Sequence, residues 1–214
     1  MNAIPEKTIE RLSEYRRTLL ECHAQGIQHI FSHVLAGIHG ITAVQVRRDL
    51  MLIGFSSDTK KGYDVKVLID FISNILDSDT VTNIAVIGMG HLGQAITKYF
   101  NGRGLKLKIT TAFDIDPAKV GQTIDGIPCH HMETFEEVVE DKDIDIVIVS
   151  SPSRVADELV VPIVNAGIKG VLNFTSRPLN FPRGIVVENY DITTLLEKVA
   201  YFVKENEESN SSNA

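Results

Sequence analysis

A glycine-rich segment has the residue types and spacing that most clearly predict a chemical role. Residues 88–93 read Gly-Met-Gly-His-Leu-Gly, with glycine at the first, third and sixth positions. Between a strand and a helix, such a loop brings backbone N–H groups and the positive end of the helix dipole to a phosphate. Gly88 would allow the tight turn, Gly90 the close approach of a pyrophosphate, and Gly93 the packing of the helix on the strand. The segment therefore predicts a dinucleotide-binding loop, the alternative being a turn with no ligand.

An acidic residue follows at the distance typical of ribose recognition. Asp114 ends a β-branched run and lies 21 residues after Gly93. In dinucleotide-binding folds an acid near this position binds the ribose hydroxyls and repels a 2′-phosphate. Asp114 thus predicts NAD(H) rather than NADP(H) as the cofactor, the alternative being an ordinary residue of a turn.

Two later loops complete the predicted cofactor site. Ser150-Ser151-Pro152 and Asn173-Phe174 each follow a strand-like run, and ligands of parallel sheets bind beyond the carboxyl ends of the strands. These loops are expected to flank the nicotinamide, although ordinary loop chemistry is an alternative. Asp116 precedes Pro117 and suits a helix N-cap. Lys119 could reach a phosphate, the alternative being a solvated surface lysine. The predicted cofactor-binding residues are Gly88, Met89, Gly90, His91, Leu92, Gly93, Asp114, Ile115, Asp116, Lys119, Ser150, Ser151, Pro152, Asn173 and Phe174.

A second candidate site lies near the N-terminus. Residues 42–50 read TAVQVRRDL, with a capping residue at Thr42 and polar side chains near the start of a predicted helix. Glutamine can pair with adenine, and arginine with guanine or phosphate, as in the recognition helix of a helix-turn-helix protein. The alternative is an amphipathic helix with a solvated Arg-Arg pair. The predicted DNA-binding residues are Thr42, Ala43, Gln45, Arg47, Arg48, Lys60 and Lys61, the two lysines belonging to a wing.

Helical and strand patterns divide the 214 residues into blocks that would position these sites. Residues 1–80 have helical periodicity, and residues 81–190 alternate β-branched runs with helical stretches. We expect an α/β protein with an N-terminal winged helix-turn-helix domain and a C-terminal Rossmann-type parallel sheet. Residues 191–205 are predicted to form a last helix, and residues 206–214 a disordered tail.

The charge distribution limits where nucleic acid could bind. The net charge is −7, which excludes a uniformly basic coat, but residues 1–66 contain nine basic and seven acidic residues. The N-terminal block is therefore the part suited to a phosphate-facing surface. No uncharged apolar run approaches the ~18 residues of a membrane span, so we expect no membrane association.

The cysteines and histidines give no catalytic or metal-binding pattern. Cys22 and Cys129 are far apart in the sequence and fit no metal-ligand spacing, which suggests a reducing, cytoplasmic setting. Adjacent residues of an extended segment point to opposite faces, so Cys129-His130-His131 is not expected to form one site. We expect no catalytic residues and no metal.

Several motifs, taken in order, resemble one known family. They are Ile4-Pro5 with residues 8–12, Gln45–Leu50, Gly62–Val65, Gly88–Gly93, Phe113–Pro117 and Gly167–Phe174. Over about residues 4–203 the chain resembles Rex, the redox-sensing transcriptional repressors of bacteria. The resemblance implies a homodimer that binds inverted-repeat operators and is released from DNA by NADH. It also implies that the C-terminal helix is swapped across the dimer.

The resemblance also implies a switch. Tyr99 and Asp191 match a family tyrosine and aspartate, and Arg17 matches a helix-1 arginine of the partner chain. In the family, the aspartate is proposed to exchange between the tyrosine and the arginine. The alternatives are a half-buried core tyrosine, the N-cap of the last helix and a surface arginine.

The chain departs from the family pattern in places. Met51-Leu52-Ile53-Gly54 replaces Ser-Tyr-Phe-Gly, and the wing at Ser56–Lys61 differs and includes Asp58. Ser150-Ser151-Pro152 replaces Ala-Val-Pro, and Thr175-Ser176 replaces Ala-Pro after Asn173-Phe174. These changes predict a more polar nicotinamide pocket. Two other functions remain open: a small NAD(P)H-dependent oxidoreductase, and an NADH-binding regulator that has lost DNA binding.

Overall fold

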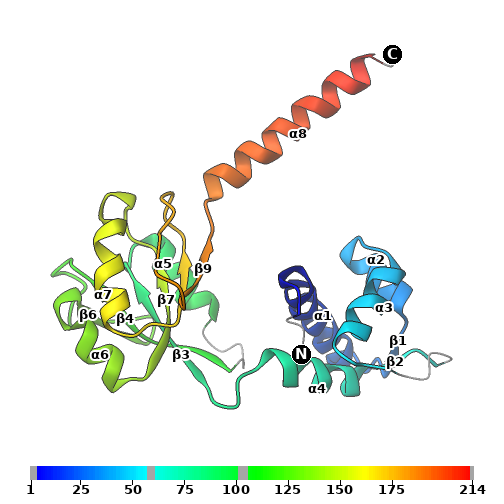
Figure 1. The fold of residues 1–214 in the computed structure, drawn as a ribbon, viewed down its shortest axis with the longest axis horizontal. Helices are drawn as coiled ribbons and strands as arrows, with labels where there is room; N and C mark the ends of the chain where they lie inside the picture. Colours follow the sequence, from blue (N-terminus) through cyan, green and yellow to red (C-terminus); the bar gives the residue numbers. More distant parts are fainter. Residues whose placement is uncertain (1–3, 57–60, 101–105, 213–214) are drawn as a thin grey trace. The chain divides into compact units, whose positions relative to one another are not determined.

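The computed structural model describes residues 4–56, 61–100 and 106–212. The chain forms two compact units that divide between Asp79 and Thr80, and Figure 1 shows the elements of each. Among the described residues, no helix combines the length and the apolar character needed to cross a bilayer.

The first unit is built mainly from helices. Its elements in chain order are α1 (Glu6–Ala24), β1 (His29–Ile30), α2 (Ser32–His39), α3 (Ala43–Leu52), β2 (Tyr63–Asp64) and α4 (Val65–Leu76). β1 and β2 pair antiparallel, and Gly62 allows their close approach. Its φ is +81°, and a Cβ at this position would lie 2.9 Å from the carbonyl oxygen of Ile30. Any other residue at Gly62 would therefore strain the base of the wing.

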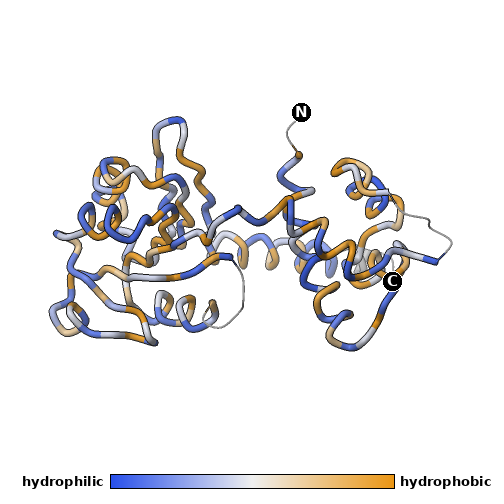
Figure 2. The backbone as a smooth tube through the Cα atoms, turned by 90° about the horizontal axis from the view of Figure 1, so that it is seen from below, coloured by the Kyte–Doolittle hydropathy of each residue, from blue (hydrophilic) through white to orange (hydrophobic). Residues whose placement is uncertain are grey.

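Side-chain caps and one continuous core explain why these helices form where they do. Thr42 accepts the N–H of Gln45 at 3.1 Å at the start of α3, and Asp64 accepts the N–H of Val67 at 2.9 Å at the start of α4. Each helix then directs one apolar stripe inward. The core contains buried residues of every helix, among them Leu12, Leu19, Leu35, Val46, Leu50, Leu68 and Ile72. Figure 2 shows the matching alternation of hydrophobic and hydrophilic residues along the helices.

The second unit contains a seven-stranded sheet. Its strands are β3 (Thr82–Ile87), β4 (Leu107–Asp114), β5 (Thr123–Ile124), β6 (Ile127–His131), β7 (Ile144–Val149), β8 (Gly170–Asn173) and β9 (Val186–Asn189). The order across the sheet is β5-β6-β4-β3-β7-β8-β9, with β5 antiparallel to β6 and the other neighbours parallel. The six parallel strands have the order of a dinucleotide-binding Rossmann fold, which reverses between β3 and β7.

Helices pack on both faces of the sheet because the central strand β3 directs apolar side chains to each face. Ile84 and Val86 belong to one core with Ile96 and Phe100 of α5 (His91–Phe100). Ala85 and Ile87 belong to another core with Val139 of α6 (Phe135–Asp141) and Ile163 of α7 (Val160–Asn165). Two 3₁₀ segments, Met132–Thr134 and Ser153–Leu159, precede α6 and α7. The alternation of side chains along a strand thus supplies both layers.

The last helix is longer than the sequence predicted. α8 runs from Ile192 to Ser212, so the prediction of a disordered tail from residue 206 is wrong for the described residues (Figure 1). Contacts between residues four positions apart favour this extension. The Tyr201 hydroxyl donates to Glu205 at 2.7 Å, and Lys204 lies 3.6 Å from Glu208. Such pairs stabilise a helix where composition alone suggests disorder.

Candidate functional site

A cavity of about 800 Å³ lies where the strand order of the second unit reverses. It is lined by the residues that follow β3 and β7 and by the end of β4. Ligands of this topology bind beyond the carboxyl ends of the strands at such a point, and the volume is typical of a small-molecule site. The position and size therefore identify the main candidate ligand site of this unit.

The glycine loop forms one wall of this cavity, and each glycine has a distinct steric reason. A Cβ at Gly88 would lie 2.8 Å from Ser151 Oγ, and one at Gly93 would overlap the carbonyl oxygen of Gly88. In contrast, a Cβ at Gly90 would meet no protein atom within 4 Å. Gly88 and Gly93 are required by the fold, whereas the space at Gly90 is open to a ligand.

The two serines after β7 support the glycine loop. Ser150 Oγ donates to the carbonyl oxygen of Gly88 at 2.8 Å, and Ser151 Oγ donates to that of Ile87 at 3.3 Å. The hydroxyl groups therefore tie the end of β7 to the end of β3. These bonds give the serines a supporting role in the loop as well as a place in the cavity wall.

Asp114 is buried at the end of β4 and is held by hydrogen bonds. One carboxylate oxygen accepts the N–H of Met89 at 2.8 Å and Lys119 Nζ at 3.0 Å. The other accepts the N–H groups of Ile115 at 2.8 Å and Asp116 at 3.0 Å. Burial would raise the pKa of Asp114, but these bonds outweigh it and hold the pKa below the ordinary value. The cavity thus contains a fixed negative charge at the position predicted for ribose recognition.

Lys119 provides the matching positive charge. Its Nζ lies 3.0 Å from Asp114 and 3.5 Å from Asp116, and the hydrogen bond to Asp114 is the main cause that raises its pKa. Asp116 Oδ1 also accepts the N–H of Ala118 at 3.0 Å, a contact that suits the start of a turn. Lys119 therefore faces carboxylates in the structure, whereas the sequence left open a phosphate contact or a solvated surface position.

The structure brings most of the predicted cofactor-binding residues to one cavity. Those that line it are Gly88, Gly90, His91, Leu92, Asp114, Ile115, Lys119, Ser150, Ser151 and Pro152. Met89, Gly93, Asp116, Asn173 and Phe174 are not among its lining residues. Asn173 is fully buried, donates to Asn189 Oδ1 and the Arg177 carbonyl at 2.8 Å each, and accepts the N–H of Thr175. These contacts give Asn173 a role in holding the loop after β8 rather than in lining the cavity.

Sequence reasoning missed the far wall of the cavity. His131, the last residue of β6, and Met132 also line it, and the remaining residues of this wall come from the 3₁₀ segment before α7 and from α7 itself: Arg154, Val155, Glu158, Leu159 and Pro162. One feature of the sequence could have pointed to these residues: they lie at or shortly after strands whose carboxyl ends meet at the same edge of the sheet.

In the first unit, the predicted DNA-reading helix is α3. Some of the predicted DNA-binding side chains are exposed, and others are held by hydrogen bonds within the unit. Arg48 and Lys61 are exposed, and Lys60 lies outside the described residues. Arg47 Nη1 donates to Ser32 Oγ of α2 at 3.1 Å. Gln45 Nε2 donates to Asp49 Oδ1 at 3.0 Å, so this amide faces an internal carboxylate and not only solvent. Thr42 caps the helix and Ala43 is half-buried.

Asp49 is a fully buried carboxylate that joins α3 to α1. Arg11 donates to it through Nε and Nη2 at 2.7 Å each, the Tyr15 hydroxyl at 2.9 Å and Thr8 Oγ1 at 3.3 Å. Burial would raise the pKa of Asp49, but the hydrogen bonds from Arg11, Gln45 and Tyr15 hold it below the ordinary value. Burial is also the main cause that raises the pKa of Tyr15. This Asp49 network fixes the position of α3, and sequence reasoning assigned no role to Asp49.

Comparisons with known proteins cover the whole chain. Residues 3–50 match the family model "putative DNA-binding protein N-terminus", and residues 79–177 match "CoA binding domain". The redox-sensing transcriptional repressor Rex of Leuconostoc citreum is 37% identical over 200 residues, covering 94% of this chain and 93% of that protein. The Rex of Lactobacillus acidophilus is 35% identical over 206 residues, covering 96% and 98%. The chain belongs to the Rex family.

Solved structures agree with this assignment. The Rex-family repressor RSP in complex with β-NAD⁺ and operator DNA gives a TM-score of 0.89 at 31% identity, covering 99% of this chain and 97% of that one. RSP in complex with β-NADH gives a TM-score of 0.85, covering 99% of both chains. The predicted resemblance to Rex and the predicted fold class, a helix-turn-helix domain plus a Rossmann-type parallel sheet, are confirmed. The swapping of the C-terminal helix stays a prediction.

The residues expected to form the Rex switch occupy different places in this chain. Tyr99 is exposed on α5 and contacts the Phe100 ring, and Arg17 is exposed on α1 in the other unit. Asp191 caps α8, where it accepts the N–H of Thr193 at 3.0 Å and the hydroxyl of Thr194 at 2.7 Å. The Thr194 bond is the main cause that lowers the pKa of Asp191. The switch roles of these three residues stay predictions.

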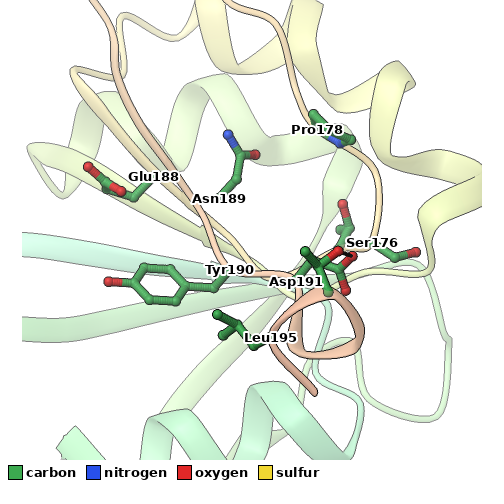
Figure 3. A pocket seen from close by; sticks show the side chains of 9 residues that line it. Ser176, Pro178, Glu188, Asn189, Tyr190, Asp191 and Leu195 are labelled. Carbon is green, nitrogen blue, oxygen red and sulfur yellow. Dashed lines mark hydrogen bonds between the residues drawn. The ribbon is translucent and has the colours of Figure 1, made fainter. Parts of the chain in front are cut away.

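Asp191 also lines a second, smaller pocket of about 340 Å³ at the start of α8. Figure 3 shows Tyr190 and Ser176 on opposite sides of Asp191, with Leu195 of α8 below them. Tyr190 stacks on Phe174, with the ring centroids 5.7 Å apart. Phe174, predicted to flank the nicotinamide, therefore packs against Tyr190, which follows β9 and precedes α8.

Proposed function

We propose that this Rex-family protein is a DNA-binding transcriptional repressor that senses the NADH/NAD⁺ ratio, with NADH releasing it from operator DNA. The observation that carries the proposal is the likeness over nearly the full chain to RSP bound to β-NAD⁺ and operator DNA. The two candidate sites support it, because one unit contains the dinucleotide cavity and the other contains α3 with its two exposed arginines. A repressor of this kind acts where bacterial DNA is, in the cytoplasm. Its relatives are named as repressors and not as enzymes.

The cavity residues fit NAD(H). Backbone N–H groups at the start of α5 and the open space at Gly90 suit a pyrophosphate. Of the four partners of Asp114, Lys119 is the one that is not a backbone group, so a ribose hydroxyl can take its place. The buried negative charge of Asp114 disfavours a 2′-phosphate at the same position. NAD(H) is therefore the cofactor that we assign to this cavity.

The sensing step needs only a difference in affinity. A ligand that binds one form of a dimer more tightly shifts the population toward that form. If NADH binds a form whose two α3 helices do not match the operator, DNA is released. In the bound form the recognition helices would lie about one or two DNA turns apart, at ~34 Å multiples.

The decisive experiment is fluorescence anisotropy of a labelled AT-rich inverted repeat, measured alone, with NAD⁺ and with NADH. The salt concentration is fixed, because phosphate contacts make the affinity salt-dependent. We expect tight binding with NAD⁺ that NADH reverses. An NADH-binding protein whose DNA affinity does not change with NADH would contradict the proposal.

We also propose that α8 packs against a second copy of the chain. The positions i, i+3, i+4, i+7, i+10 and i+11 of this helix form one apolar stripe of Ile192, Leu195, Leu196, Val199, Phe202 and Val203. All of them are half exposed or more, between 50% and 64%. An apolar surface of this kind marks a protein interface.

A substitution within this stripe tests the dimer. Val199→Lys is expected to weaken dimerisation by about tenfold or more, since a buried valine contributes about 1.5–3 kcal/mol. Glu197→Lys introduces the same residue on the opposite side of α8 and should leave the dimer intact. Molar mass measured by light scattering across a dilution series distinguishes them. Equal dimerisation of both variants would show that the stripe is not the interface.

A further inference from the structure

The exposed face of α3 contains two apolar side chains that nothing in the described part of the chain covers. Val44 is 64% exposed and Met51 is 75% exposed. Together with Arg47 and Arg48 they occupy positions i, i+3, i+4 and i+7, so all four side chains lie on one face of the helix. Val46, Asp49 and Leu50 lie on the buried face.

The charges on α3 separate in the same way. The helix contains one acidic residue, Asp49, which is buried and paired with Arg11. The exposed face therefore presents two guanidinium groups and no carboxylate from its own helix. A surface with this charge is complementary to the phosphates of DNA, whereas an apolar protein surface gives the two arginines no partner.

Local contacts decide which side chains of α3 are free to read a base. Arg47 donates to Ser32, and Gln45 donates to Asp49. These contacts restrain two of the residues that the sequence favoured as readers. Val44 and Met51 have no polar group to engage, and they stand at the two ends of the exposed face.

We propose that Val44 and Met51 read the C5-methyl groups of thymines in the major groove, on either side of the contacts made by Arg47 and Arg48. The thymine methyl is the apolar group that a base pair presents in that groove. Seven residues of helix span about 10.5 Å, which matches about three base-pair steps. The inference rests on the proposed function and specifies which operator feature this chain recognises.

The test replaces single thymines by deoxyuridine, which lacks only the C5-methyl group. The full-length protein first selects a duplex from a random library, and that duplex is then resynthesised with one deoxyuridine at a time. Anisotropy at fixed salt measures each affinity. We expect wild type to bind about fourfold more weakly when either of two thymines in each half-site is replaced, since that is the effect of one buried methyl group.

Matched variants assign each methyl group to a side chain. Val44→Ala and Met51→Ser should each abolish the difference between thymine and deoxyuridine at one position and keep it at the other. Val67→Ala makes a similar truncation at an exposed position of α4, 54% exposed, and should keep both differences.

Two outcomes would overturn the inference alone. Either every deoxyuridine duplex binds as tightly as its parent, or the differences persist unchanged in both α3 variants. Failure to select any duplex would overturn the proposed function, and the inference with it.

Discussion

Gly90→Val is expected to abolish the response to NADH while leaving the protein folded and able to bind DNA. A Cβ at Gly90 meets no protein atom within 4 Å, so the larger side chain costs the fold little. It extends into the space that the pyrophosphate needs in order to reach the N-terminus of α5. Losing two hydrogen bonds to a charged group, at about 1.5–3 kcal/mol each, weakens binding at least ~100-fold.

The measurement combines two titrations of Gly90→Val. The chain has no tryptophan, so NADH fluorescence can be followed without energy transfer from that residue, and calorimetry gives an independent affinity. DNA anisotropy of the variant should match that of wild type without cofactor and should no longer fall when NADH is added. Unchanged NADH affinity would show that the cofactor does not approach the loop at Gly90.

Gly93→Ala is the control that separates ligand space from folding. Its Cβ would overlap the carbonyl oxygen of Gly88 and lie 2.9 Å from Ser150 Oγ. We expect this small change to lower the melting temperature, whereas Gly90→Val should melt close to wild type. Equal melting temperatures for all three proteins would contradict the distinction between the two glycines.

The contrast between these glycines shows what a motif can and cannot predict. The spacing of residues 88–93 predicts the loop and its neighbours, because the turn, the strand and the helix are consequences of local sequence. The caps at Thr42 and Asp64 are local in the same sense. The far wall with Arg154 and Pro162 depends on how α7 packs on the sheet. That packing is a tertiary property with no short sequence pattern.

Short strands are hard to predict from the sequence for a related reason. β5 has two residues and β9 four, too few for an alternating pattern to stand out. They are stabilised by a neighbour already present in the sheet, as β9 is by β8. Cys129-His130-His131, for which the sequence predicts an extended segment and no common site, ends β6, a strand beside β4.

The helical pattern of α3 contains a signal for the role of Asp49. In the pattern of α3, Val46, Asp49 and Leu50 share the buried face, so an acid occupies a core position. A buried carboxylate requires partners, and Thr8, Arg11 and Tyr15 recur at helical spacing on α1. Reading the two helices together would have predicted the ion pair, while each motif alone suggests a surface residue.

The Asp49 network leads to the second large prediction, a loss of stability confined to the DNA-binding unit. Asp49→Ala removes the acceptor of five hydrogen bonds and leaves Arg11, whose side chain is 21% exposed, and the buried Tyr15 hydroxyl without it. Breaking a buried ion pair in this way costs about 3–5 kcal/mol. Asp70→Ala makes the same change at an exposed position of α4 and should have little effect.

The two-unit architecture makes this prediction specific. Urea unfolding of Asp49→Ala should lower the midpoint at which DNA binding is lost, while the midpoint for loss of NADH binding stays near wild type. A parallel shift of both midpoints would contradict a network confined to the first unit. Asp49→Asn keeps the shape without the charge and should fall between wild type and Asp49→Ala.

The pH dependence follows from the directions of the two pKa shifts. Asp49 has a lowered pKa, so its stabilising contribution is complete above the ordinary value near 4 and is lost as the pH falls through its folded-state pKa. Tyr15 has a raised pKa, so its contribution is complete below about 10 and is lost as the pH rises beyond that value. The network should therefore hold α3 equally well between about pH 5 and 9. Unfolding midpoints of wild type and Asp49→Ala measured across pH should differ by a constant amount in this window and converge in acid, because the variant has no carboxylate to protonate. A difference that varied across neutral pH would show that another titrating group, and not Asp49, fixes the recognition helix.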